Sequence, residues 1–155
     1  MKYKYILFDL DGTITESGPG IMNSVEYALN KMNREVGERD TLKKFIGPPL
    51  TESMEKYYGM SEEEALLGVK YYREYYAVKG IFENSVYEGL AETLESLENE
   101  GYILAVATSK PEEYAKRIAD KFDFAKYFAG IYGATMDGSL IRKADVIRYA
   151  LDNLG

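Results

Sequence analysis

The sequence predicts an α/β fold in which a parallel β-sheet is interrupted, after its first strand, by a block of helices. The first apolar run, Tyr5–Phe8, stops at a polar turn and is typical of a buried strand. Between Gly18 and Val86 the apolar residues recur at helical spacing. From Gly89 onward helical and strand patterns alternate, which implies parallel strands joined by right-handed crossovers.

The first strand is apolar on both faces, which suits the middle of a parallel sheet better than its edge. In the helical block that follows, turn residues separate the helices. Gly47-Pro48-Pro49 breaks one pattern, Gly59 ends the next, and Ser61 followed by three acids is typical of a helix start. The apolar positions of these predicted helices lie in the ranges Ile21–Met32, Leu42–Ile46, Thr51–Tyr58 and Leu66–Gly80.

The second half of the chain is predicted to alternate between helix and strand. Gly101 is placed to end the first of its helices. Ser109 and Glu112 have the spacing of a capping box, with Pro111 in the first turn, so the next helix is predicted to begin there. In chain order the predicted elements are a helix over Leu90–Leu97, a strand over Tyr102–Ala107, a helix over Tyr114–Phe122, a strand over Tyr127–Ala134 and a helix over Val146–Leu154.

The composition is that of a globular protein, since 46% of the 155 residues are apolar and 29% are charged. The formal net charge of −7 argues against nonspecific binding to nucleic acid or to an anionic membrane. The chain has no cysteine and no histidine, which excludes disulfide scaffolds, zinc fingers, cysteine nucleophiles and Ser-His-Asp triads. With no apolar run long enough for a signal peptide or a membrane span, the expected location is the cytoplasm.

Two aspartates follow the first predicted strand, at the sheet edge where open α/β sheets bind ligands. Alternation along the chain aims Asp9 and Asp11 differently, so one carboxylate can attack while the other handles protons. Gly12 permits a turn that bares backbone N–H groups to an anion, and Thr13 can help to fix that turn. The simpler interpretation is that Asp-Gly only makes a turn after a strand.

The run Ile6–Thr13 resembles the first motif of the haloacid dehalogenase-like hydrolase superfamily, a strand followed by Asp-x-Asp-Gly-Thr. The resemblance implies a Rossmann-like core in which Asp9 is the nucleophile that forms an aspartyl-phosphate. It also implies that Asp11 protonates the leaving oxygen and then activates water. A Mg²⁺ ion would bridge Asp9, Asp11 and the phosphoryl group. The presence of Asp11 favours phosphate transfer, because cleavage of a carbon–halogen bond has no leaving oxygen to protonate.

Two further motifs of the superfamily have matches later in the chain. Val106–Ser109 resembles the second motif, in which the Thr108 hydroxyl and the Ser109 N–H would bind the phosphoryl group, with Lys110 as a further binding candidate. Lys143 best resembles the third-motif cation, which would offset the charge of Asp9 and of the phosphoryl group, although Lys110 and Arg142 compete for that role. The simpler interpretations are an ordinary helix start and a solvated lysine.

The helical block resembles the small cap of the branch that contains phosphoglycolate phosphatases and 5′-nucleotidase-like members. The predicted domains are therefore a core of residues 1–16 and 87–155 and a cap of residues 17–86. Gly47 and Pro48 resemble the cap loop that reaches the active site in that branch, and an interhelix turn with two prolines remains an equal alternative.

The superfamily's fourth motif, which supplies acidic metal ligands after a fourth strand, has no match before Gly155. The chain is therefore expected to be C-terminally truncated, with an incomplete metal site and an unpaired edge on the first strand. Such an edge invites dimerisation or strand exchange.

The expected function is Mg²⁺-dependent hydrolysis of a small phosphate monoester such as phosphoglycolate, a nucleotide or a sugar phosphate, with little or no activity in the short form. The expected partner is a small phosphorylated metabolite, and neither nucleic acid nor membrane. The alternatives are a sugar-phosphate mutase of the same superfamily and a noncatalytic, self-associating fragment.

Overall fold

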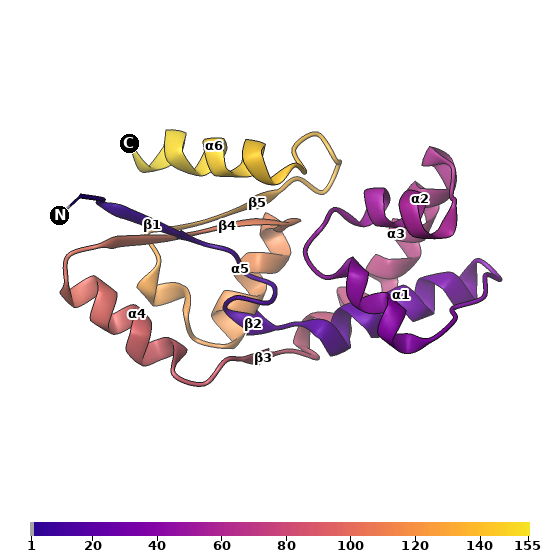
Figure 1. The fold of residues 1–155 in the computed structure, drawn as a ribbon, viewed down its shortest axis with the longest axis horizontal. Coiled ribbons are helices and arrows are strands. Elements are labelled where there is room, and N and C mark those ends of the chain that lie inside the picture. Colours follow the sequence, from indigo (N-terminus) through magenta and orange to yellow (C-terminus); the bar gives the residue numbers. More distant parts are fainter. Residues whose placement is uncertain (1) are drawn as a thin grey trace. The chain divides into compact units, whose positions relative to one another are not determined.

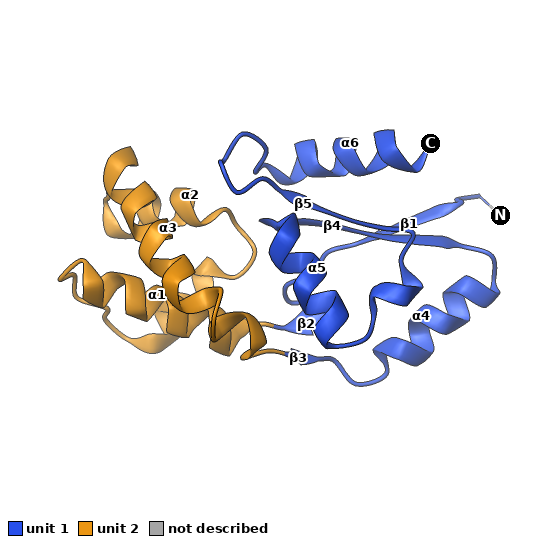
Figure 2. Ribbon diagram, turned by 180° about the vertical axis from the view of Figure 1, so that it is seen from behind, with its two compact units in different colours: residues 1–16, 85–155 blue, residues 17–84 orange. Residues whose placement is uncertain are grey.

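A computed structural model describes residues 2–155, and the described chain divides into two compact units (Figure 2). One unit contains the residues up to Glu16 together with Ser85–Gly155, and the other contains Ser17–Asn84. The chain leaves the first unit after β2 (Thr15–Glu16) and returns to it at β3 (Ser85–Val86), and these two short strands pair antiparallel. The boundary expected from the sequence, at residues 86/87, falls two residues later than this division.

The first unit is an α/β core built on a parallel sheet (Figure 1). In the described residues the strand order is β1-β4-β5, with Phe8 of β1 opposite Val106 of β4. Helix α6 covers one face of the sheet, and α4 and α5 lie on the other face. The strands are β1 (Tyr5–Phe8), β4 (Ile103–Pro111) and β5 (Gly130–Ala134), and the helices are α4 (Leu90–Asn99), α5 (Glu112–Lys121), the short 3₁₀ helix η3 (Ala125–Tyr127) and α6 (Lys143–Leu154).

Strand β1 lies at the edge of the described sheet, and its four residues are all half-buried. Phe8 packs edge-on against Phe128 at a centroid distance of 5.8 Å, and the Tyr5 hydroxyl donates to the Leu154 carbonyl at 3.2 Å. The central position predicted from the apolar run is therefore wrong for the described chain, which has the open edge expected without a fourth strand. An apolar run reports burial of both faces of a strand, and it does not report a neighbour on both edges.

Two predicted boundaries in the core are wrong. The third strand begins at Gly130 and not at Tyr127, because residues 125–127 form η3. The second strand runs on to Pro111, so α5 begins at Glu112 without a side-chain cap, and Ser109 does not cap it. The cause is the proline, because the residue before a proline disfavours helical backbone, and a cap at Ser109 would require Lys110 to be the first helical residue.

The second unit is helical and has its own buried core. Its elements are α1 (Gly18–Lys31), the 3₁₀ helix η1 (Arg39–Phe45), α2 (Leu50–Tyr58), α3 (Glu62–Tyr76) and the 3₁₀ helix η2 (Gly80–Phe82). Its largest fully buried side chains are Leu29, Leu42, Phe45, Met54, Tyr76 and Ile81. The predicted start of α3 is confirmed, since Ser61 and Glu64 form a reciprocal capping box.

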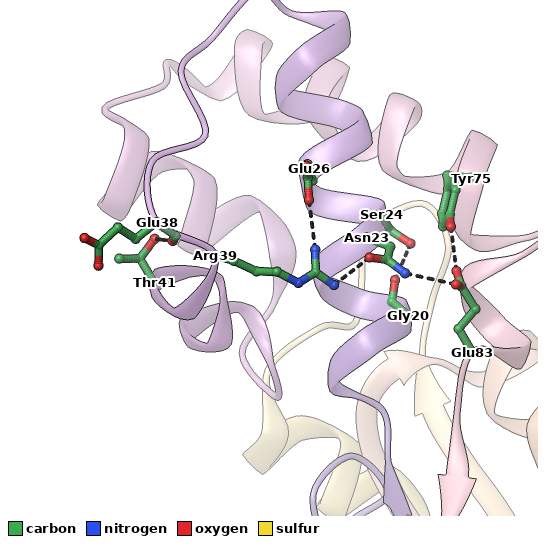
Figure 3. A network of polar contacts seen from close by, with 9 residues as sticks. All are labelled: Gly20, Asn23, Ser24, Glu26, Glu38, Arg39, Thr41, Tyr75 and Glu83. Atoms are coloured by element: carbon green, nitrogen blue, oxygen red, sulfur yellow. Dashed lines mark hydrogen bonds and ion pairs between the residues drawn. The ribbon is translucent and has the colours of Figure 1, made fainter.

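The first and last turns of the second unit are held together. A Cβ atom on Gly20 would lie 2.0 Å from the Gly80 carbonyl oxygen, so a glycine is needed for the two backbones to approach. The Gly20 N–H donates to the Glu83 carbonyl at 3.0 Å. The Glu83 carboxylate in turn accepts from Asn23 at 2.9 Å and from the Tyr75 hydroxyl at 2.7 Å (Figure 3). The hydrogen bond to Glu83 raises the pKa of Tyr75 above its ordinary value.

No helix in the described part of the chain is both long and apolar enough to cross a membrane.

Candidate active site

The chain turns sharply after β1, around a buried leucine. Asp9 follows the strand, and its Oδ1 accepts the Leu10 N–H at 2.8 Å. The Leu10 carbonyl then accepts the N–H groups of residues 13–15 at 2.9–3.2 Å, which closes the loop. Gly12 has a φ of +77°, a left-handed conformation that glycine adopts without strain. The predicted turn at Asp-Gly is therefore present, and it bears both aspartates.

Both aspartates of this loop form an ion pair with a lysine. Lys143 Nζ lies 2.7 Å from Asp9 Oδ1, and Lys110 Nζ lies 3.2 Å from Asp11 Oδ1. The first pair is open to solvent, with 42% of the Asp9 side chain exposed, whereas the Asp11 and Lys110 side chains are 7% and 6% exposed. Asp9 is thus accessible to a ligand, while Asp11 is held in a buried ion pair.

The contacts of the Asp9 carboxylate are one-sided. Among the described residues its hydrogen bond from Leu10 and its ion pair with Lys143 both involve Oδ1. This arrangement leaves Oδ2 as the oxygen that can approach an electrophile.

Lys143 is the first residue of α6 and also binds the sheet. Its Nζ donates to the Ala107 carbonyl at 2.5 Å, so the ammonium joins the ends of β1 and β4. Arg142, the residue before it, is exposed, and Lys110 contacts the other aspartate. The role of the Ala107 carbonyl was not foreseen from the sequence, because a backbone atom leaves no signal in residue type.

The residues of the second motif lie in a bulge of β4. Ala107 pairs with Tyr132 and Pro111 pairs with Ala134, so three residues of β4, Thr108–Lys110, face the single residue Gly133 of β5. Within the bulge the Thr108 hydroxyl, which is buried, accepts the Lys110 N–H at 3.1 Å. Because Phe8, the last residue of β1, pairs with Val106, the bulge in the C-terminal part of β4 lies on the same side of the sheet as Asp9, which follows β1.

The segment before α6 is a compact turn. The Ser139 N–H donates to Asp137 Oδ1 at 2.9 Å, and the Leu140 N–H donates to the Thr135 hydroxyl at 2.9 Å. Hydrogen bonds from Ser139 lower the pKa of Asp137 to about 2. Asp137-Gly138 is therefore a turn, as its sequence indicates.

Gly47 and Pro48 belong to the second unit, where they link η1 to α2 and are exposed. Gly47 has a φ of +105°, which explains the need for glycine there. Their role in an active site stays a prediction.

The donors present fit a magnesium ion in part. Mg²⁺ binds through one or two carboxylates and completes its shell with substrate phosphate and water. Asp9 offers an accessible carboxylate, whereas the Asp11 side chain is buried and its Oδ1 lies 3.2 Å from Lys110 Nζ. No cluster of three acidic or other metal-binding side chains occurs within residues 2–155.

The sequence is similar to one protein family and to several named proteins. Residues 6–155 match the family described as haloacid dehalogenase-like hydrolase. The chain is 43% identical over all 155 residues to a "5′-nucleotidase" of Pseudomonas aeruginosa, covering 70% of that protein. It is 41% identical over 150 residues to "Tyrosine-protein kinase PtkA" of Mycobacterium tuberculosis, covering 96% of this chain and 50% of that one. It is 30% identical over 152 residues to a "Phosphoglycolate phosphatase" of Aquifex aeolicus, covering 98% and 70%.

Solved structures agree with the fold. A "predicted phosphatase from Clostridium acetobutylicum" superposes with a TM-score of 0.96 at 49% identity, over 98% of this chain and 70% of that one. The structure of PtkA from Mycobacterium tuberculosis superposes with a TM-score of 0.86 at 39% identity, over 98% and 69%. The chain thus spans between half and about 70% of the length of these relatives.

Proposed function

The chain belongs to the haloacid dehalogenase-like hydrolase family, and we propose that it hydrolyses a small phosphate monoester through an aspartyl-phosphate on Asp9. Its class is that of a phosphoric monoester hydrolase, as the relatives named 5′-nucleotidase and phosphoglycolate phosphatase indicate. The observation that carries the proposal is the exposed Asp9 carboxylate, bound on Oδ1 by Lys143 and open on Oδ2.

In the first step Asp9 Oδ2 attacks phosphorus, and the bond from phosphorus to the ester oxygen breaks. In this step Asp11 acts as a carboxylic acid, released from its ion pair with Lys110, and the leaving alcohol takes its proton. In the second step a water molecule gives a proton back to Asp11 and attacks phosphorus, which releases inorganic phosphate and restores Asp9. Lys143 offsets the negative charge that Asp9 and the phosphoryl group bring together.

The bulge of β4 supplies the proposed phosphoryl-binding groups. The Thr108 hydroxyl, the Ser109 N–H and the Lys110 ammonium come from consecutive residues at this edge of the sheet. The N–H groups of Gly12 and Thr13 donate within the loop after β1, to the Thr15 carbonyl at 2.8 Å and to the Leu10 carbonyl at 3.2 Å, so these two residues are proposed to shape the site rather than to bind the phosphoryl group through those N–H groups. Gly47 and Pro48 are proposed to contribute to substrate choice from the helical unit.

The Asp9 carboxylate and the Asp11 main-chain carbonyl would hold a Mg²⁺ ion. When bound, the ion would neutralise phosphoryl charge in the net acidic protein. Chelation should therefore abolish turnover, and added Mg²⁺ should restore it.

A second candidate is transfer of the phosphoryl group to an acceptor other than water. It is favoured by the 41% identity to a protein named as a tyrosine kinase, and a sugar-phosphate mutase falls in the same group of reactions. Both would use the same intermediate on Asp9, so the fate of that intermediate separates them.

The test is a panel of phosphoglycolate, nucleoside monophosphates and sugar phosphates, assayed with Mg²⁺ for release of inorganic phosphate. Hydrolysis of one class supports the phosphatase, and label appearing on a sugar or a tyrosine in place of inorganic phosphate supports the transferase. If neither occurs, in this chain or in the chain joined to the part of the P. aeruginosa relative outside the match, the noncatalytic alternative stands.

A further inference from the structure

One acidic side chain beside the site has a position that the proposed reaction does not use. Glu112, the first residue of α5, has a side chain that is 26% exposed. Its Oε1 accepts the Gly133 N–H of β5 at 3.3 Å and the Tyr149 hydroxyl of α6 at 3.2 Å, and its Oε2 accepts from Lys116 at 3.1 Å. A single carboxylate thus contacts three elements of the core.

The contact with Gly133 compensates for the bulge. In a regular parallel ladder the N–H groups of one strand donate to the carbonyls of the next. At a bulge this ladder is interrupted. Gly133 is the residue of β5 that faces Thr108–Lys110, and its N–H donates to the Glu112 carboxylate.

The backbones at this point are in close contact. A Cβ atom on Gly133 would lie 2.6 Å from the Lys110 carbonyl oxygen and 2.6 Å from Glu112 Cα. Both partners are backbone atoms, so the position requires glycine. The bulge and β5 are therefore in close backbone contact, and the hydrogen bond from Gly133 to Glu112 stabilises that contact.

The contact with Tyr149 connects the same carboxylate to the catalytic lysine. Tyr149 follows Lys143 by six residues on α6, or roughly 9 Å along the helix axis. Its ring packs edge-on against Tyr132 of β5 at a centroid distance of 5.3 Å. Burial, and then the nearby Glu112, raise the pKa of Tyr149.

We propose that Glu112 is a positioning residue for the phosphoryl site. Its carboxylate holds the bulge of Thr108–Lys110 against β5, and through Tyr149 it fixes α6 so that Lys143 reaches Asp9. The proposal rests on the proposed function, but the structural part of it can be measured without turnover.

The experiment compares Glu112→Ala with Glu113→Ala, an exposed acid in the same first turn of α5. Glu112→Ala should raise the dissociation constant of inorganic phosphate, measured by calorimetry, roughly tenfold or more, because small displacements of binding groups are costly. It should also increase amide hydrogen exchange at Gly133. Glu113→Ala should change neither quantity by more than about twofold, since surface substitutions have small effects.

Two conservative variants separate positioning from simple stability. Glu112→Gln keeps an oxygen acceptor and should recover most of the phosphate affinity. Tyr149→Phe removes only the link to α6, so it should lower kcat through Lys143 more than it raises KM. These two variants also carry the test if Glu112→Ala does not fold.

The proposal is overturned if phosphate affinity and Gly133 exchange respond equally to Glu112→Ala and Glu113→Ala, or if Glu112→Gln is as impaired as the alanine variant. If exchange at Gly133 rises in Glu112→Ala but the unsubstituted chain neither binds phosphate nor turns over an ester, the proposed function fails and Glu112 keeps only its role in the bulge.

Discussion

At the scale of single residues, two lysines pair with the two aspartates of the loop after β1. Lys143 contacts the exposed Asp9 and the Ala107 carbonyl, whereas Lys110 is buried against Asp11. The sequence left Lys110, Arg142 and Lys143 as competitors, because a lysine's partner cannot be deduced from its neighbours in the chain. The structure shows that Lys143, at the start of α6, reaches Asp9 and also donates to the Ala107 carbonyl of β4.

Lys143→Ala should lower kcat/KM by about 10²–10³-fold, the usual loss when a group that stabilises transition-state charge is removed. Arg142→Ala, its exposed neighbour, should stay within about threefold of the unsubstituted chain. Steady-state assays of both variants on the best ester of the panel make the comparison, and equal losses would remove Lys143 from the site.

Asp137→Asn tests the turn before α6. The folded-state pKa of Asp137, about 2, lies below its ordinary value of 3.8, so its stabilising contribution is present above pH 3.8 and is lost as the pH falls through about 2. The variant should therefore be less stable than the unsubstituted chain near neutral pH, and the difference should shrink toward about pH 2. Urea unfolding across this range measures it, with Asp152→Asn on α6 as the control. A gap that is constant with pH would contradict the assignment.

At the scale of secondary structure, local signals and non-local pairing account for what could be predicted. The helix start predicted at Ser61 is confirmed, with a capping box between Ser61 and Glu64, because such a box depends only on two residues that lie three positions apart in the sequence. The capping box predicted from the same spacing at Ser109 and Glu112 is wrong, because Pro111 keeps the preceding residue extended. The bulge itself could not be predicted, since it is defined by the pairing of β4 with β5, which lies some 25 residues away.

Gly20→Ala tests the close approach of the first and last turns of the helical unit. The added Cβ would meet the backbone of Gly80, so the variant should lose about 1–3 kcal/mol of unfolding free energy, as overpacked positions do. Gly18→Ala lies in the same first turn of α1 and meets its nearest atom, on Ile46, at 3.5 Å. Its stability should change by less than about 1 kcal/mol. Similar changes of stability in both variants, measured by urea unfolding, would contradict a specific role for the close approach of Gly20 to Gly80.

At the scale of the whole molecule, β1 lies at an open edge of the described sheet. In the described chain this strand pairs on one side only, and its apolar residues are half-buried. An unpaired edge of this kind is a template for another strand. The parallel core with an inserted helical block could be predicted from hydrophobic patterns, whereas the position of β1 depends on which strands are present.

We expect the 155-residue chain to self-associate through β1. Sedimentation velocity should show a dimer whose population rises with concentration. The chain joined to the part of the P. aeruginosa relative outside the match should be monomeric and more active. A stable monomer at every concentration, with no added strand, would contradict self-association through this edge.

The most direct measurement of the central claim is to trap the phosphorylated protein. After brief exposure to a radiolabelled ester and rapid quenching, label should be bound to the chain at Asp9, as peptide mapping would show. Asp9→Asn should carry none, and Lys143→Ala should accumulate it more slowly. Label on another residue, or turnover that persists in Asp9→Asn, would contradict nucleophilic attack by this aspartate.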